Sequence, residues 1–171
     1  MSKNIYRNIS TMLVCLLILP VKPAYAFYSV NNAYINSSSP DFSTELSGYF
    51  KKIQPIYNEL YYLGESVYSA LIKKQNAENL INQIDYEIAN LNSIRENLFM
   101  LSNNTNISST EQGIALGILI TTGYYKLAYQ SLRIALTTKD SAMQIKYLED
   151  FFRYNTLGST TLNSIEKNIN L

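Results

Sequence analysis

The side chains that most often carry enzymatic chemistry are scarce in this chain of 171 residues. It contains no histidine, and its single cysteine is Cys15. Ser-His-Asp and Cys-His triads, ordinary zinc sites and Glu-x-x-His di-iron bundles all require histidine or cysteine, so the sequence argues against each of them. It also lacks the spacing of a glycine-rich phosphate loop or a calcium loop. We therefore predict that the protein is not an enzyme and has no catalytic, cofactor-binding or metal site.

Carboxylate chemistry is the one class that these absences leave open. The closest acidic pairs are Asp85 with Glu87 and Glu149 with Asp150. Residues one or two apart on a helix point in different directions, so neither pair converges on one substrate atom. We interpret both pairs as parts of solvated helix faces. A pair of acids brought together from different helices stays open at the level of the sequence.

Three glycines form the most specific contact prediction. The segment 113–120 has no polar side chain and opens a helix expected over about 110–136. Gly113 and Gly117 make a GxxxG pair, and Gly123 follows. Small residues let helices approach closely, both in membranes and in soluble cores. We expect these glycines to serve helix packing in a soluble bundle, with the first half of their helix enclosed on most sides; membrane contact is the alternative.

The element expected to position these residues is a long apolar seam over 53–101. Apolar residues recur there every three or four positions, interrupted by Lys74 and Arg95. This rhythm is typical of a coiled coil or of the buried face of a bundle helix. Pro55 and Gly64 weaken its first part, so we expect a kink or break there and one long helix over about 65–101. Arg95 and Lys74 are expected to extend their charges to water or to form a buried pair.

The rest of the chain completes an all-α pattern. We expect a helix to begin at Pro40, a polar loop over 102–109, and a fourth helix that stops at a left-handed Gly158. A short last helix is expected over 160–169. Short connections make neighbouring helices antiparallel, which predicts an elongated up-and-down bundle of three to four main helices over 40–171.

The first 26 residues are typical of a secretory signal peptide. Lys3 and Arg7 precede the apolar run 12–19, and Ala24-Tyr25-Ala26 matches a cleavage site, so we expect cleavage after Ala26. Retention as an anchor is the alternative. Residues 27–39 are expected to form an irregular arm. Cleavage would remove Cys15, and a cysteine-free exported domain fits a bacterial envelope, so we expect a periplasmic or secreted protein.

Charge and layout favour a binding protein. Of the 14 basic residues, Lys3, Arg7 and Lys22 lie in the predicted signal peptide, which contains no acid, so the remainder is slightly acidic. Without a basic cluster, nucleic acid is not expected as a partner. The order of signal peptide, polar arm and long helix resembles the exported pilus-tip subunits of type IV secretion systems in layout, without a shared motif.

We therefore expect a non-catalytic helical protein of the cell envelope or exterior that acts through protein–protein interaction. A secretion or conjugation accessory subunit and an immunity protein are examples, and a homo-oligomer is compatible with the sequence. The alternative is a membrane-active protein that inserts the apolar segment 113–120.

Overall fold

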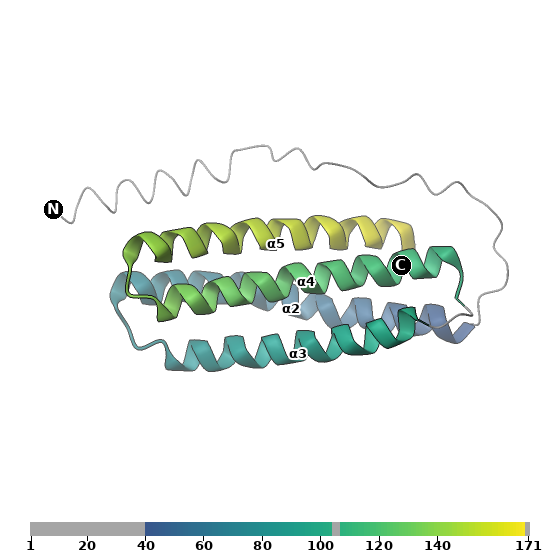
Figure 1. Ribbon diagram of the computed structural model, residues 1–171, viewed down its shortest axis with the longest axis horizontal. Coiled ribbons are helices and arrows are strands. Elements are labelled where there is room, and N and C mark those ends of the chain that lie inside the picture. The colour runs from purple at the N-terminus through teal and green to yellow at the C-terminus, as the bar shows by residue number, and fades with distance from the viewer. Residues whose placement is uncertain (1–39, 104–106, 170–171) are drawn as a thin grey trace. The chain divides into compact units, whose positions relative to one another are not determined.

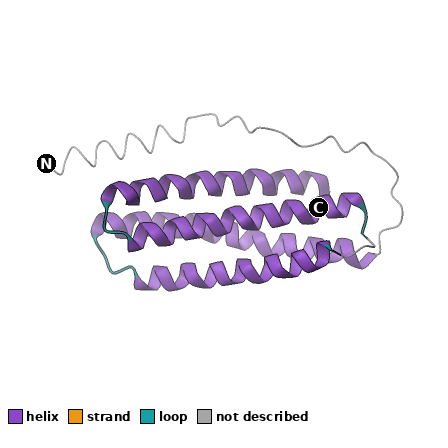
Figure 2. Ribbon diagram, in the orientation of Figure 1, coloured by secondary structure: helices purple, strands orange, loops and turns teal. Residues whose placement is uncertain are grey.

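The computed structural model describes residues 40–103 and 107–169, which lie in one compact unit. Over these residues it contains no strand and four helices: α2 (Pro40–Lys73), α3 (Glu78–Ser102), α4 (Ser109–Thr137) and α5 (Ser141–Ile169), shown in Figures 1 and 2. The all-α prediction and the helical bundle are confirmed. The predicted signal peptide and arm, over 1–26 and 27–39, fall outside the described residues.

The helix α4 is the centre of the bundle. It contacts the other three helices, α5 most extensively, whereas α3 and α5 do not touch each other. In Figure 1, α4 lies between α3 and α5, with α2 behind it. Cross-contacts show that α3 and α4 are antiparallel, because Asp85 in the first turns of α3 pairs with Arg133 in the last turns of α4. In the arrangement of Figure 1, one side of α4 faces α2 and the opposite side faces away from the bundle.

Each helix contributes an apolar stripe to one continuous core. The seam of α2 is buried from Leu46 to Ala70, and α3 adds Ile84, Leu91 and Leu98. The inner face of α4 supplies two fully buried rings, Tyr125 and Tyr129. Burial of large side chains at about 25 cal/mol per Å² of apolar surface is the main stabilising term for such a bundle. The predicted seam therefore does face the core, but it is divided between two helices.

The prediction of one long helix over 65–101 is wrong. α2 ends at Lys73, and Lys74 adopts a left-handed φ of 52°. The Gln75 N–H then donates to the Ala70 carbonyl at 3.0 Å, the bond that closes a Schellman motif. Asn76 Oδ1 accepts from the Glu78 N–H at 2.9 Å and so helps to start α3. This turn contains neither glycine nor proline, and its polar residues reverse the chain in their place.

The predicted break in α2 is also wrong. The helix runs without interruption through Pro55 and Gly64. Pro55 is exposed, so water can reach the carbonyl of the preceding turn that loses its partner to the missing N–H. Gly64 is buried under the ring of Phe151 from α5, and a Cβ at Gly64 would lie 2.5 Å from Phe151 Cζ. Gly64 is therefore a close-packing position and not a hinge.

The expected stop at Gly158, and the separate helix over 160–169, are contradicted in the same way. α5 is continuous from Ser141 to Ile169, and no glycine of the described chain has a positive φ. Gly158 is buried, and the Tyr125 ring occupies the space where its Cβ would stand. Absence of a side chain therefore marks a position where an aromatic ring of a neighbouring helix packs against the backbone.

Polar side chains cap the helices that follow the two remaining connections. Ser108 caps α4 in a reciprocal capping box with Glu111. Asp140 Oδ1 accepts from the Ala142 N–H at 2.8 Å at the start of α5.

Candidate interaction surface

The outward side of α4 carries large aliphatic side chains. Leu116, Ile120, Leu127 and Ile134 are 49%, 48%, 40% and 38% exposed. At 100° per residue, these four positions lie within about 40° of one another around the helix. The first half of this helix is enclosed on the sides that face α2, α3 and α5, as predicted, but the prediction did not allow for an uncovered outer face.

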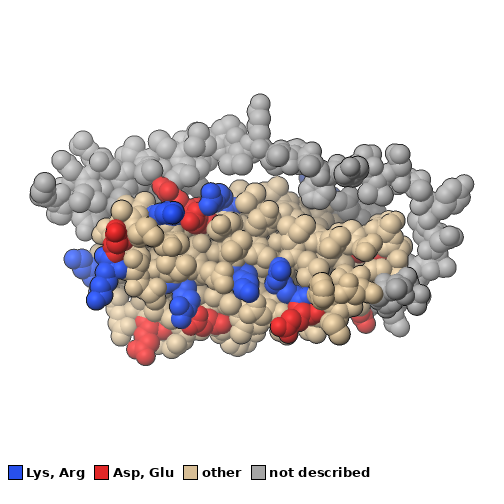
Figure 3. Space-filling model, viewed as in Figure 1, with Lys and Arg blue, Asp and Glu red and all other residues tan. Residues whose placement is uncertain are grey.

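We define the α4 strip as the residues that share this outward side. They are Gly113, Leu116, Ile120, Gly123, Leu127, Gln130, Ile134 and Thr137. None of them is charged. Figure 3, viewed as in Figure 1, shows this side of the molecule as mostly uncharged surface with several basic side chains near its middle. Isolated exposed aliphatic residues are normal, but several in a row on one helix form a continuous apolar surface.

Basic side chains border the strip on the side of α3. Arg133 pairs with Asp85, its Nε lying 2.6 Å from Oδ1, and this bond raises the pKa of Arg133. Arg95 reaches across from α3, where its Nη1 donates to the Leu119 carbonyl at 2.6 Å. Both guanidinium groups are therefore held by α3–α4 contacts. They form a polar rim beside an apolar centre, which is the usual layout of a protein interface.

The three predicted glycines have three different surroundings. A Cβ at Gly113 would meet nothing within 4 Å, so this position is open on the outer side. At Gly117 it would lie 2.9 Å from Ile165 Cγ1, which places this residue in the contact between α4 and α5. At Gly123 it would lie 2.9 Å from Arg95 Nη1. The GxxxG pair thus does not act as one surface. Gly117 faces α5, Gly113 is open on the strip, and Gly123 lies on the strip but is covered by Arg95 of α3.

Neither of the two acidic pairs, Asp85 with Glu87 and Glu149 with Asp150, converges on a common point. Asp85 binds Arg133 on the surface, while Glu87 is buried against α2 and α4. Asp150 pairs with Arg153 on its own helix. Over the described residues no group of three or more histidine, cysteine, aspartate or glutamate side chains is placed to hold a metal ion.

The interpretation of Glu87 as part of a solvated helix face is wrong, because its side chain is buried. Burial raises the pKa of Glu87, a hydrogen bond from Asn90 opposes this, and the nearby charge of Glu59 raises it further. Glu59 also accepts a 2.6 Å hydrogen bond from Gln83. Burial likewise raises the pKa of Tyr129, whose hydroxyl donates to the Ile56 carbonyl at 3.2 Å. Among the described residues neither Glu87 nor Glu59 forms an ion pair, so the buried charge of Glu87 works against stability at neutral pH.

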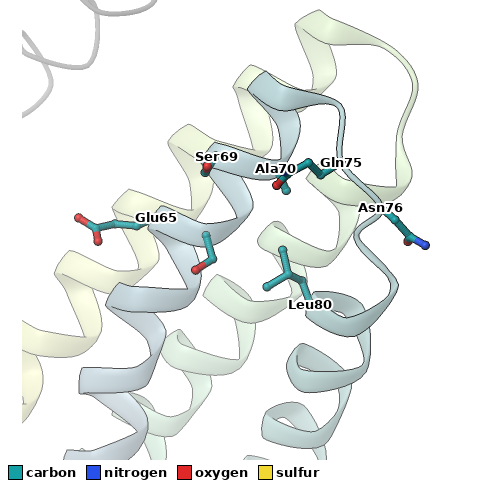
Figure 4. Close-up of a pocket in the computed structure, with 7 residues that line it drawn as sticks. Glu65, Ser69, Ala70, Gln75, Asn76 and Leu80 are labelled. Atoms are coloured by element: carbon teal, nitrogen blue, oxygen red, sulfur yellow. The ribbon is translucent and has the colours of Figure 1, made fainter.

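A shallow hollow lies where α2 ends and the chain turns into α3 (Figure 4). Its lining includes Ser66, Ser69, Gln75 and Asn76. The Ser66 hydroxyl donates to the Tyr62 carbonyl, and Asn76 caps α3, so these two side chains already have partners. Glu65 points away from the turn in Figure 4.

Comparison of the chain with protein-family models, curated proteins and solved structures finds no match. Among the described residues no helix is long and apolar enough to cross a membrane.

Proposed function

We propose that this chain is an exported, non-catalytic helical protein that binds another protein of the cell envelope or exterior through the α4 strip. The observation that carries the proposal is the second apolar face of α4. Its inner face already fills the core with Tyr125, Tyr129 and Leu132, and its outer face leaves four aliphatic side chains uncovered. An uncharged strip of this kind with a polar rim is better suited to a protein partner than to water.

Export is supported by the residues of the first 26 positions, namely the basic start, the apolar run and the small-x-small site at Ala26. Mass spectrometry of the protein recovered from its native cells tests this part. The expected mature chain begins at Phe27. A chain that keeps Met1 and stays inside the cell would contradict export.

Secretion or conjugation accessory subunits and immunity proteins stay as examples of the class. In the layout that resembles pilus-tip subunits, the long helix after the arm is α2, of 34 residues, and not the one predicted over 65–101. The binding face alone supports the broader proposal.

A membrane-active protein is the second candidate, and one observation favours it: Leu116 and Ile120 of the apolar segment are about half exposed. Such side chains can enter a lipid interface from a helix that lies on it. The flanking Lys126 would then meet anionic head groups. The net charge of the body, which is slightly acidic, favours the protein partner.

Site-specific photo-cross-linking in the native cells tests the proposed binding face. A photoreactive residue at Leu127 should capture one partner in stoichiometric amount, and the same residue at Ile72 should not. Ile72 is a matched control, because it is 41% exposed against 40% for Leu127 and lies on α2. Equal capture at both positions, or none, would contradict the role of the strip.

Flotation with vesicles of phosphatidylethanolamine and phosphatidylglycerol separates the second candidate. We expect the full chain not to float. Flotation that Leu116→Glu abolishes would replace the proposed function with the membrane-active one.

A further inference from the structure

We infer that the contact between α2 and α3 at Glu87 is a pH-sensitive switch, which holds α3 on α2 when the Glu87 carboxyl is protonated and releases it when the carboxyl is ionised. This switch lies inside the bundle, away from the α4 strip, and does not rest on the proposed function. It is carried by the burial of Glu87, by the hydrogen bonds around it and by the second acid beside it.

Glu87 is a buried carboxyl without the partners that a buried charge requires. Its side chain is 5% exposed, on the face of α3 that also carries the fully buried Ile84 and Leu91. Asn90 Nδ2 donates to its Oε2 at 3.4 Å, which is a long hydrogen bond, and within the described residues Glu87 forms no ion pair. An ionised carboxylate in such a place is much less favourable than a neutral carboxyl.

A second acid reaches Glu87 from α2. Glu59 Oε1 accepts a 2.6 Å hydrogen bond from Gln83 Nε2, so its carboxylate extends across to α3. Gln83 and Glu87 are four residues apart, and side chains at this spacing are neighbours on one side of a helix. The carboxyl groups of Glu59 and Glu87 therefore lie about one helical turn apart. A proton on Glu87 removes the repulsion between them and supplies an O–H donor beside an acceptor on α2.

From α4, the titratable group that interacts with Glu87 is the Tyr129 hydroxyl. It is buried and donates to a backbone carbonyl of α2 at 3.2 Å. Burial raises the pKa of Tyr129, and the charges of Glu87 and Glu59 raise it further, so the hydroxyl stays neutral. Arg133, one turn further along α4, is bound to Asp85 at the surface, and α5 does not touch α3. Titration of this contact therefore belongs to Glu87, with the half-exposed Glu59 beside it.

The direction of the switch follows from the burial of Glu87. Burial raises the pKa of this carboxyl above its ordinary 4.5, the hydrogen bond from Asn90 lowers it, and the charge of Glu59 raises it further. The closed contact thus binds the proton more tightly than the open one, in which Glu87 is in water. Closure is therefore fully favoured below pH 4.5 and weakens as pH rises through the folded-state pKa.

The contact between α2 and α3 is the part of the bundle that can yield to this charge. α3 contacts α4 more extensively than it contacts α2. Two polar contacts also fix it to α4, namely the ion pair of Asp85 with Arg133 and a 2.6 Å hydrogen bond from Arg95 Nη1 to a backbone carbonyl of α4. An ionised Glu87 therefore reaches water most easily when α3 stays on α4 and parts from α2, with the connection at 74–77 as the hinge.

NMR titration of the carboxyl carbons and native-state hydrogen exchange test the switch in the full chain. Once the known pH dependence of the chemical exchange step is divided out, the protection factors of the amides over 84–91 should fall between pH 4 and pH 8. The fall should be tenfold for each whole unit by which the measured pKa of Glu87 exceeds 4.5. A pKa at or below 4.5, or protection that does not change with pH, overturns the inference.

Low concentrations of urea separate this opening from unfolding of the whole bundle, because urea accelerates exchange in proportion to the surface that an opening exposes. The amides over 84–91 should show a weaker urea dependence than the most protected amides of α5. An equal dependence in both helices would mean that Glu87 titrates only when the whole bundle unfolds, and would overturn the switch.

Three variants assign the effect to its residue. Glu87→Gln keeps the size of the side chain without its charge and should make protection over 84–91 equal at both pH values. Glu59→Gln keeps an acceptor oxygen for Gln83 and should reduce the fall without abolishing it, because Glu87 remains buried. Glu96→Gln, which removes an exposed acid from the same helix, is the matched control and should leave the fall unchanged. Far-UV circular dichroism checks that each variant is folded. A fall that persists in Glu87→Gln, or that Glu96→Gln also abolishes, overturns the inference.

Discussion

Replacing Gly64 by alanine tests the packing of α2 on α5. The new Cβ would stand 2.5 Å from Phe151 Cζ and 2.7 Å from Cε1, where ordinary contacts begin near 3.4 Å. Phe151 is 2% exposed and packs on Phe152 with ring centroids 4.9 Å apart, so its ring cannot simply swing away. Overpacking of this kind costs about 3 kcal/mol at its upper range. Alanine returns about 1 kcal/mol of helix propensity, which leaves a net loss of about 2 kcal/mol.

Urea unfolding followed by far-UV circular dichroism measures this loss of unfolding free energy. In thermal unfolding the same loss should lower Tm by on the order of 5 °C. Gly48→Ala is the matched control in the same helix, because its Cβ would meet nothing within 4 Å. It should gain about 0.5–1 kcal/mol. Alanine at the two glycines should therefore change the free energy of unfolding in opposite directions.

A double-mutant cycle with Phe151→Leu identifies the cause. If the ring is the obstacle, Gly64→Ala should cost at least about 1 kcal/mol less in the Phe151→Leu background than in the natural chain. An additive cycle, or a stabilising Gly64→Ala, would refute the seating of Phe151 on Gly64. The same result would restore the reading of Gly64 as a backbone hinge.

Two further predictions concern buried polar groups. Burial raises the pKa of Glu87 above its ordinary 4.5, so the folded chain holds this proton more tightly than the unfolded chain. The free energy of unfolding should therefore fall as pH rises from 4.5 through the folded-state pKa. Glu87→Gln should remove this dependence and raise stability at pH 7, measured by urea unfolding from pH 4 to 8. Within 40–103 and 107–169 the buried Tyr125 hydroxyl has no hydrogen-bond partner, whereas that of Tyr129 donates to the Ile56 carbonyl. Tyr125→Phe should therefore be neutral or stabilising and Tyr129→Phe should cost about 1 kcal/mol; equal losses in thermal unfolding would contradict this difference.

The sequence predicted which residues are apolar and helical better than where the helices end. Periodicity reveals the buried seam from Ile53 to Leu98, because the spacing of apolar residues reports directly on a shared face. The turn at Lys74 was missed, because lysine enters the left-handed region there without the glycine that usually marks it. Gly64 and Gly158 were misread for the opposite reason. A glycine looks the same in a sequence whether it frees the backbone or makes room for a ring from another helix.

The candidate surface was predicted only in part, because the spacing of apolar residues along a helix does not say what covers its apolar face. Gly113 and Gly123 were identified as contact positions, but the aliphatic residues between them were assigned to an enclosed helix. Which helix occupies the centre of the bundle depends on contacts between distant segments. α4 contacts all three neighbours, and this leaves its fourth side to the exterior.

The two faces of α4 together support binding to a partner protein more strongly than either face would alone. A helix that is apolar all round is normally enclosed by protein or lipid. In a four-helix bundle only the inner stripe is enclosed, and Ile118, Tyr125 and Leu132 already fill it. If stability were the sole constraint, polar residues at Ile120 and Leu127 would cost little, because about half of each side chain is in water. Aliphatic residues that repeat along that side of the helix are better explained by contact with a partner protein than by the stability of the bundle.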